Sequence, residues 1–176
     1  LSVLAGAVLM SSSVVWAATP TGWTEVDGVG YVRDSSNGDG TVPNSLYEKN
    51  FYGAYSETNT TSEIKNGIIT ITGGTFQKDA SMTHYFYGGF AEYSGKDKDD
   101  VKVTASVNNC IVNISGDKTV MTSGACFGIM IFGGHVLDNE INKGLAEYNK
   151  VEISGGKIGN KQYDSTKNVY VYGGSA

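Results

Sequence analysis

Apolar residues recur at every second position along seven short segments of the chain, and each segment runs into a glycine. The segments are of two kinds, and the two kinds alternate strictly along the sequence. The first kind reads IITITGG (68–74), IVNISGD (111–117) and KVEISGG (150–156). The second reads NFYGA (50–54), YFYGG (85–89), MIFGG (130–134) and YVYGG (170–174). Because every second side chain of a strand points to one face, each segment predicts a half-buried strand that ends in a glycine turn.

Two columns of residues form the apolar side of these strands. Two positions before the leading glycine, all seven residues are apolar: Phe51, Ile71, Phe86, Ile114, Ile131, Ile153 and Val171. Four positions before it, five of the seven are apolar, namely Ile69, Val112, Ile129, Val151 and Val169, and the exceptions are Lys49 and His84. We expect both columns to face inward.

The spacing of the glycines predicts the fold. The leading glycines stand at 53, 73, 88, 116, 133, 155 and 173, with a mean gap of 20 residues. No amphipathic helical segment lies between the strands, and one short strand cannot bury its inner face alone. The sequence therefore predicts an all-β fold, a parallel β-solenoid (β-helix) of roughly 20-residue coils. A β-sandwich is the alternative, since seven short strands would also fit it.

The outward positions of the second kind of segment carry aromatic residues, whereas those of the first kind carry mainly Thr, Ser and Asn. One interpretation is stabilisation, since aromatic neighbours on adjacent strands contribute about 0.2–1 kcal/mol per pair, or the rings are covered by a loop. The other is an exposed stripe that stacks on sugar rings or on another solenoid. The candidate binding residues are Tyr52, Tyr85, Tyr87, Phe132, Tyr170 and Tyr172.

The N-terminus predicts export. Residues 1–10 are almost wholly apolar or small, and Val15 and Ala17 suit the −3 and −1 positions of a signal peptidase site. We expect a signal peptide over 1–17 that lacks its first residues, with cleavage between Ala17 and Ala18; a buried strand or helix is the alternative. An irregular lead-in or cap is expected over 18–49, followed by solenoid repeats over 50–176 that are cut mid-repeat.

Charge and cysteine content narrow the function classes. The formal net charge of −5 and the pI of about 4.9 argue against nucleic-acid binding. Cys110 and Cys126 are the only cysteines, and they fit a disulfide as well as buried thiols.

No cluster of Cys and His has metal-ligand spacing, so no metal and no cofactor are expected. The stretch DSSNGDGTV (34–42) lacks the acidic residues that a calcium loop needs at its first and last positions.

Catalytic patterns are weak. His84 and His135 both adjoin Gly–Gly segments, where packing is the commoner role for a histidine. Sugar hydrolysis needs two carboxylates held about 5–10 Å apart, and no spacing marks such a pair among Asp79, Glu92, Asp97 and Asp138. We therefore expect a protein that is not an enzyme.

The alternation of KVEISGGKI with VYVYGGSA after a signal-like N-terminus resembles the passenger-region repeats of bacterial autotransporter (type V secretion) proteins. The resemblance covers about 51–176. It implies a parallel β-helix that is exported through the outer membrane and is displayed at the cell surface or shed. It also implies an adhesin or a structural rod, and a membrane contact only through a C-terminal barrel that this chain does not contain.

The expected function is thus adhesion or self-association by a secreted or surface-displayed passenger. Its partner would be a surface glycan, a surface protein or another copy of the chain, and nucleic acid is not expected. A carbohydrate-active β-helix enzyme and an inert spacer are the alternatives.

Overall fold

The computed structural model describes residues 17–36, 38–58, 62–77, 83–93, 105–121, 128–137, 144–158 and 168–176. Over these residues the fold is all-β, and no helix there is long and apolar enough to cross a bilayer. The strands are β1 (Trp23–Val26), β2 (Gly30–Arg33), β3 (Thr41–Val42), β4 (Leu46–Tyr47), β5 (Phe51–Tyr52), β6 (Tyr55–Thr58), β7 (Ser62–Lys65), β8 (Ile68–Ile71), β9 (Gly74–Phe76), β10 (Thr83–Tyr93), β11 (Ala105–Asn108), β12 (Ile111–Ile114), β13 (Thr119–Met121), β14 (Gly128–Leu137), β15 (Gly144–Glu147), β16 (Lys150–Ile153), β17 (Lys157–Ile158) and β18 (Asn168–Ser175).

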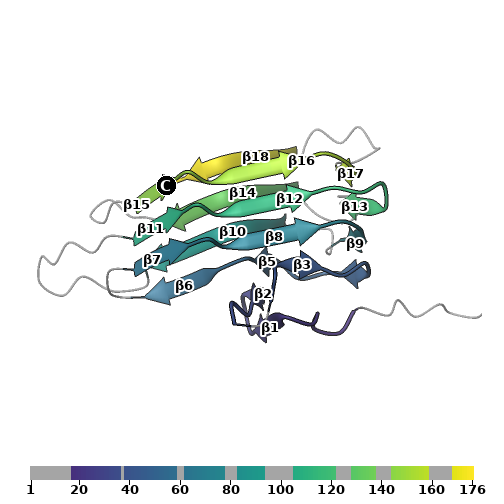
Figure 1. Cartoon of the computed structure of the whole chain (residues 1–176), viewed down its shortest axis with the longest axis horizontal. Coiled ribbons are helices and arrows are strands. Elements are labelled where there is room, and N and C mark those ends of the chain that lie inside the picture. The colour runs from purple at the N-terminus through teal and green to yellow at the C-terminus, as the bar shows by residue number, and fades with distance from the viewer. Residues whose placement is uncertain are drawn as a thin grey trace, which may run out of the picture.

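The strands form four sheets. Their orders are β1-β2-β5-β10-β14-β18 with β6 beside β10, then β7-β11-β15, β3-β8-β12-β16 and β4-β9-β13-β17. Successive strands along the chain enter the four sheets in turn, so that strands close in sequence lie at the same level in different sheets. The strands therefore lie in tiers, from β1 and β2 at one end to β15–β18 at the other (Figure 1). Among the described strands, every pair is parallel except β1 with β2. The sandwich alternative is therefore wrong, because sandwich sheets are antiparallel.

The expected stacking repeat of roughly 20 residues is also wrong. Ile71 pairs with Ile114 and Ile114 with Ile153, which are 43 and 39 positions further along the chain. The two kinds of segment lie in different sheets, the first on β8, β12 and β16 and the second on β5, β10, β14 and β18. Among the seven segments, each therefore pairs only with segments of its own kind, and the spacing between successive glycines is about half of the distance along the chain between paired segments.

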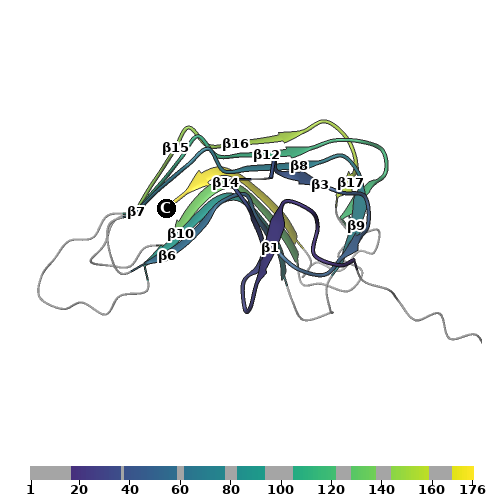
Figure 2. The same cartoon turned by 60° about the horizontal axis from the view of Figure 1, so that its bottom comes forward.

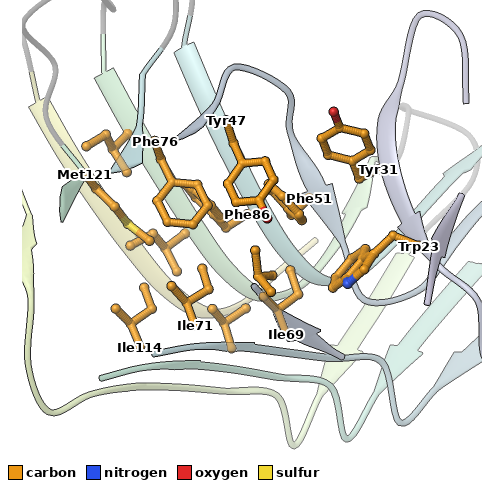
Figure 3. Packing of buried hydrophobic residues seen from close by; sticks show 14 residues of the cluster. Trp23, Tyr31, Tyr47, Phe51, Ile69, Ile71, Phe76, Phe86, Ile114 and Met121 are labelled. Carbon is orange, nitrogen blue, oxygen red and sulfur yellow. The ribbon is translucent and has the colours of Figure 1, made fainter. Parts of the chain in front are cut away.

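Both apolar columns face inward, and they meet in one core. Phe51, Ile71, Phe86 and Ile131 are fully buried, and Ile114 is 1% exposed. Figure 3 shows the aromatic residues of this core beside the isoleucines of β8 and β12, with Trp23 and Tyr31 toward the N-terminal end. Such interdigitated packing across facing sheets is the main source of stability in a fold of this kind.

A second, smaller core lies beyond the Gly–Gly sequences. The sheet that contains β10 and β14 bends sharply (Figure 2). Before the glycines, Phe86 packs in the main core; after them, Ala91 packs with Val107, Cys110 and Val136. Gly88 lies at the bend, where an added Cβ would be 2.9 Å from the Ile111 nitrogen, so only glycine lets the two sheets approach this closely.

The segment expected to be an irregular lead-in carries β1 to β4 and closes the N-terminal end of the tiers. The antiparallel β1–β2 hairpin adds to the edge of β5. Trp23 is buried against Phe51 with ring centroids 5.1 Å apart, and its Nε1 donates to the Thr41 carbonyl over 3.0 Å. Of the expected signal peptide only Ala17 is described; its N–H donates to the Leu46 carbonyl over 3.0 Å.

Candidate functional site: the outer aromatic face

Aromatic side chains line the outer face of the bent sheet. Tyr52, Tyr87, Phe132 and Tyr172 occupy one register position on β5, β10, β14 and β18. Successive ring centroids are 5.1, 5.0 and 4.8 Å apart, and each pair is stacked. The parallel, in-register strands therefore bring these candidate residues into one ladder. Tyr85 and Tyr170 stack beside it, 5.6 Å from Tyr87 and 6.4 Å from Tyr172.

A second aromatic row lies beside this ladder, and the sequence pattern did not reveal it. Two adjacent glycines in β10 shift the alternation of side chains, so that Phe90 joins Tyr87 on the outer face although an odd number of positions separates them. Their ring centroids are 4.8 Å apart. Phe90 also stacks on Tyr55 at 5.7 Å and contacts His135 at 5.5 Å. The signal lay in Phe90 and His135, which directly follow the Gly–Gly pairs of β10 and β14, but an alternation pattern that stops at the glycines does not include them.

Most of the ladder is buried by its own neighbours. Tyr52, Tyr87 and Phe132 keep only 6–7% of their surface exposed, because Phe90, Val32 and other side chains pack around them. Tyr85 is half-buried. Of the candidate binding residues, only Tyr170 and Tyr172 are exposed, at 38% and 41%. Among the described residues, the rings of the ladder are therefore exposed only on β18.

The inward columns are exposed at the same end of the tiers. Ile153 on β16 and Val171 on β18 are 45% and 46% exposed, whereas their register partners Ile114 and Ile131 are buried. In the part of the chain that the structure describes, no strand pairs with the free side of β16 or β18. This end comprises β15, β16, β17 and β18, and apolar side chains there lie beside strand edges that no described strand pairs.

Burial and acidic neighbours shape the electrostatics of the aromatic face. Burial raises the pKa of Tyr52 to about 12, and nearby Tyr85 and Glu92 add to this increase. Burial likewise raises the pKa of Tyr55 to about 12, and its hydroxyl donates to Glu57 Oε2 over 3.1 Å. The phenols therefore stay protonated at neutral pH and act as neutral hydrogen-bonding groups.

Glu57 and Glu92 are register partners on β6 and β10, so two carboxylates lie side by side at the rim of the aromatic face. The sequence pattern had singled out Glu92 without Glu57. None of the ion pairs among the described residues involves either of them. Asp79, Asp97 and Asp138, the other candidate acids, lie outside the described residues.

The remaining candidates are structural where they can be placed. His84 is 1% exposed and its Nε2 lies 2.6 Å from the Lys49 carbonyl oxygen, which places it in the core. Cys110 is a buried free thiol whose pKa is raised by burial, while Cys126 lies outside the described residues. Asp34 and Asp39 accept hydrogen bonds from Ser36 and Thr41 two residues on, which are local turn contacts. Over the described part of the chain, no three His, Cys, Asp or Glu side chains are grouped to hold a metal ion.

Comparison with protein-family models, with curated proteins and with solved structures finds no match for this chain.

Proposed function

We propose that the chain is a stretch of parallel β-solenoid that acts as a non-enzymatic, self-associating or adhesive module. The solenoid interpretation is supported by the tiers: β7, β8, β9 and β10 each belong to a different sheet, and β11–β14 and β15–β18 repeat the same order of sheets. A chain that visits the same four sheets in the same order on each pass winds around one axis.

Surface display is part of this proposal. It is supported by the signal-like N-terminal sequence and by the resemblance of the repeats to autotransporter passengers. The partner would be a surface glycan, a surface protein or a second copy of the chain.

The observation that carries the adhesive role is the stacked row of rings on the outer face of the bent sheet. The rings of Tyr87 and Phe132 are 5.0 Å apart, those of Phe132 and Tyr172 are 4.8 Å apart, and Tyr85 and Tyr170 stack beside this row. Stacked aromatic rings on an outer face are suited to contact with sugar rings or with another protein surface.

Sedimentation velocity over a range of concentrations, together with adhesion to glycan-coated and protein-coated surfaces, tests this function. We expect the wild type to associate or adhere, and the double variant Tyr170→Ser/Tyr172→Ser to do so at least about tenfold more weakly, because two exposed rings each contribute about 1 kcal/mol or more. Tyr148→Ser is the matched control, since Tyr148 is 80% exposed but belongs to the turn between β15 and β16. Wild-type chain that neither associates nor adheres would leave the inert spacer as the better explanation.

One observation favours a second candidate, a carbohydrate-active enzyme. Glu57 and Glu92 place two carboxylates beside aromatic rings that suit sugar stacking. Release of reducing sugar from a polysaccharide panel by the wild type, and its loss in Glu92→Gln, would establish this candidate; absence of turnover by the wild type would exclude it for the sugars tested.

A further inference from the structure

Two carboxylates meet at the rim of the aromatic face without a described cation beside them. Glu57 and Glu92 are register partners on the parallel strands β6 and β10, which lie side by side in the bent sheet (Figure 2). Neighbouring strands are about 4.8 Å apart, and like charges directly opposite each other are destabilising. Glu92 is half-buried and has neither a hydrogen bond nor an ion pair with another described residue. The free chain therefore keeps an unfavourable pair of charges that a bound cation would relieve.

The phenols beside Glu92 sense the same negative charge. Burial raises the pKa of Tyr52, Tyr55 and Tyr87, and Glu92 adds to the increase at each of them. No lysine or arginine of the described chain acts on any of the three phenols. The Tyr87 side chain is 6% exposed, and its hydroxyl has no hydrogen-bond partner among the described residues. A buried polar group without a partner, within electrostatic reach of Glu92, is a second and independent sign that this place takes a polar ligand.

The Tyr55 ring supplies an aromatic surface next to the two carboxylates. It stacks on Phe90 with the ring planes 3° apart, and Tyr52 meets it edge-on with centroids 5.3 Å apart. Among the described residues these are the only rings that contact Tyr55, so one face of this half-buried ring has no ring against it. The face of an aromatic ring is electron-rich and attracts cations. A cation that reaches Glu57 and Glu92 therefore also meets the Tyr55 ring.

A guanidinium group suits this place better than other cations do. It is planar, stacks on aromatic rings, and directs five N–H donors in a rigid fork toward carboxylate oxygens. Its charge-assisted hydrogen bonds to carboxylates are about twice as strong as neutral ones. The ammonium group of lysine is compact and strongly hydrated, and a quaternary ammonium group has no N–H to donate. A neutral sugar would leave both carboxylate charges uncompensated.

We infer that Tyr55, Phe90, Glu57 and Glu92 form a binding site for an exposed arginine side chain of a partner protein, with the guanidinium held by the two carboxylates and stacked on the Tyr55 ring. This inference rests on the proposed adhesive function and specifies its partner as a surface protein that exposes arginine. Net attraction comes from the charges, because the negative chain and a basic partner surface are complementary.

The test is a titration of the full chain, with its tyrosines labelled with carbon-13, followed by nuclear magnetic resonance. The probes are two capped tripeptides, Gly-Arg-Gly and Gly-Lys-Gly, together with choline and methyl glucoside. We expect the arginine peptide to shift the Tyr55 ring signals to saturation, and to bind at least about threefold more tightly than the lysine peptide, because guanidinium stacks better on the ring.

Three charge-matched variants show whether the two carboxylates hold the arginine. Glu57→Gln and Glu92→Gln should each weaken binding of the arginine peptide at least about tenfold, since each loses a hydrogen bond between charged groups. Glu147→Gln removes the same charge from an exposed position on β15 and should leave binding unchanged. Glu57→Gln should also raise the urea midpoint of the free chain, because it removes the repulsion from Glu92. Weaker binding by a more stable variant cannot result from unfolding.

Each other outcome overturns a defined part of the inference. An arginine peptide that shifts no tyrosine signal, or that is weakened equally by Glu147→Gln, overturns the site. Equal or tighter binding of the lysine peptide, choline or methyl glucoside overturns the choice of arginine.

An adhesion assay separates this inference from the proposed function. The arginines of a coating protein are blocked with butanedione before the chain is added. We expect adhesion of the wild type to fall to the level of Glu92→Gln on the untreated coating. Unchanged adhesion after blocking overturns the inference and leaves the adhesive function standing. A wild type that adheres to no coating overturns the adhesive function, and the peptide titration still decides whether the site binds arginine.

Discussion

The rings of Tyr87 and Phe90 lie 4.8 Å apart on the outer face of β10, although strict alternation would place them on opposite faces. The two intervening glycines cause this change. Gly89 pairs with Gly134 on β14, and a Cβ at Gly89 would lie 2.5 Å from Cys110 Sγ and 2.7 Å from Val107 Cγ1. The Gly–Gly segment therefore does more than end a strand: it bends the sheet, separates the two cores and joins two aromatic rows.

Gly89→Ala tests this account. The new methyl group would overfill the smaller core, and we expect a loss of about 1–3 kcal/mol in the free energy of unfolding, measured by urea denaturation. Cys110→Ala removes the sulfur atom that the methyl group meets, so the double variant should be less destabilised than the sum of the two single variants. Additive losses would show that Cys110 is not the obstacle.

The sequence predicted the inward columns because alternation along a strand depends only on local geometry, and Ile69, Ile71 and Val112 lie where it placed them. It did not predict which segments pair. Segments of the two kinds could stack on each other in turn, or each kind could stack with its own kind in a separate sheet. Only contacts between residues that are distant in sequence decide between these two arrangements. The sequence left open whether Tyr52 and Tyr87 are packed by neighbours or form an exposed stripe, because Phe90, which packs against them, lies beyond the glycines. The hairpin of β1 and β2 was missed because 18–49 lacks the repeated segments.

Tyr148 occupies a strained backbone position that recurs in three successive turns. Its φ is 55°, and the corresponding residues Asn66 and Asn109 have φ of 57° and 54°. Asparagine tolerates this left-handed conformation better than tyrosine does. We expect Tyr148→Asn to raise the free energy of unfolding by about 1 kcal/mol, because Tyr148 is exposed and gives up little packing. Glu147→Asn, one residue earlier and outside the positive-φ region, should not stabilise; equal stabilisation by both would contradict the strain argument.

Arg33 ties the N-terminal hairpin to the tiers that follow it. Its Nε donates to the Gly53 carbonyl over 2.9 Å, and its two terminal nitrogens donate to the carbonyls of Gly38 and Asn66 over 3.5 and 3.3 Å. Arg33→Lys keeps the charge but cannot span three carbonyls, so we expect a loss of about 1.5–3 kcal/mol in unfolding free energy. Lys118→Arg is a surface control that should change little. A thermal midpoint of Arg33→Lys equal to that of the wild type would show that the three contacts add no net stability.

Alkaline pH should weaken the fold through the buried phenols of the aromatic face. Burial raises the pKa of Tyr52 to about 12 in the folded chain, compared with an ordinary value of about 10. Between these two values the folded state holds the Tyr52 proton and the unfolded state has lost it. The stabilisation is therefore complete below pH 10 and is lost as the pH rises toward 12, by about 2–3 kcal/mol for a shift of this size.

The Tyr52→Phe variant cannot ionise at this position, so its unfolding free energy should fall less steeply over the same range. Subtracting its absorbance titration at 295 nm from that of the wild type should give a single midpoint near pH 12. A midpoint near 10, or parallel stability curves for the two proteins, would mean that water reaches the Tyr52 hydroxyl and that the ladder is open along its length.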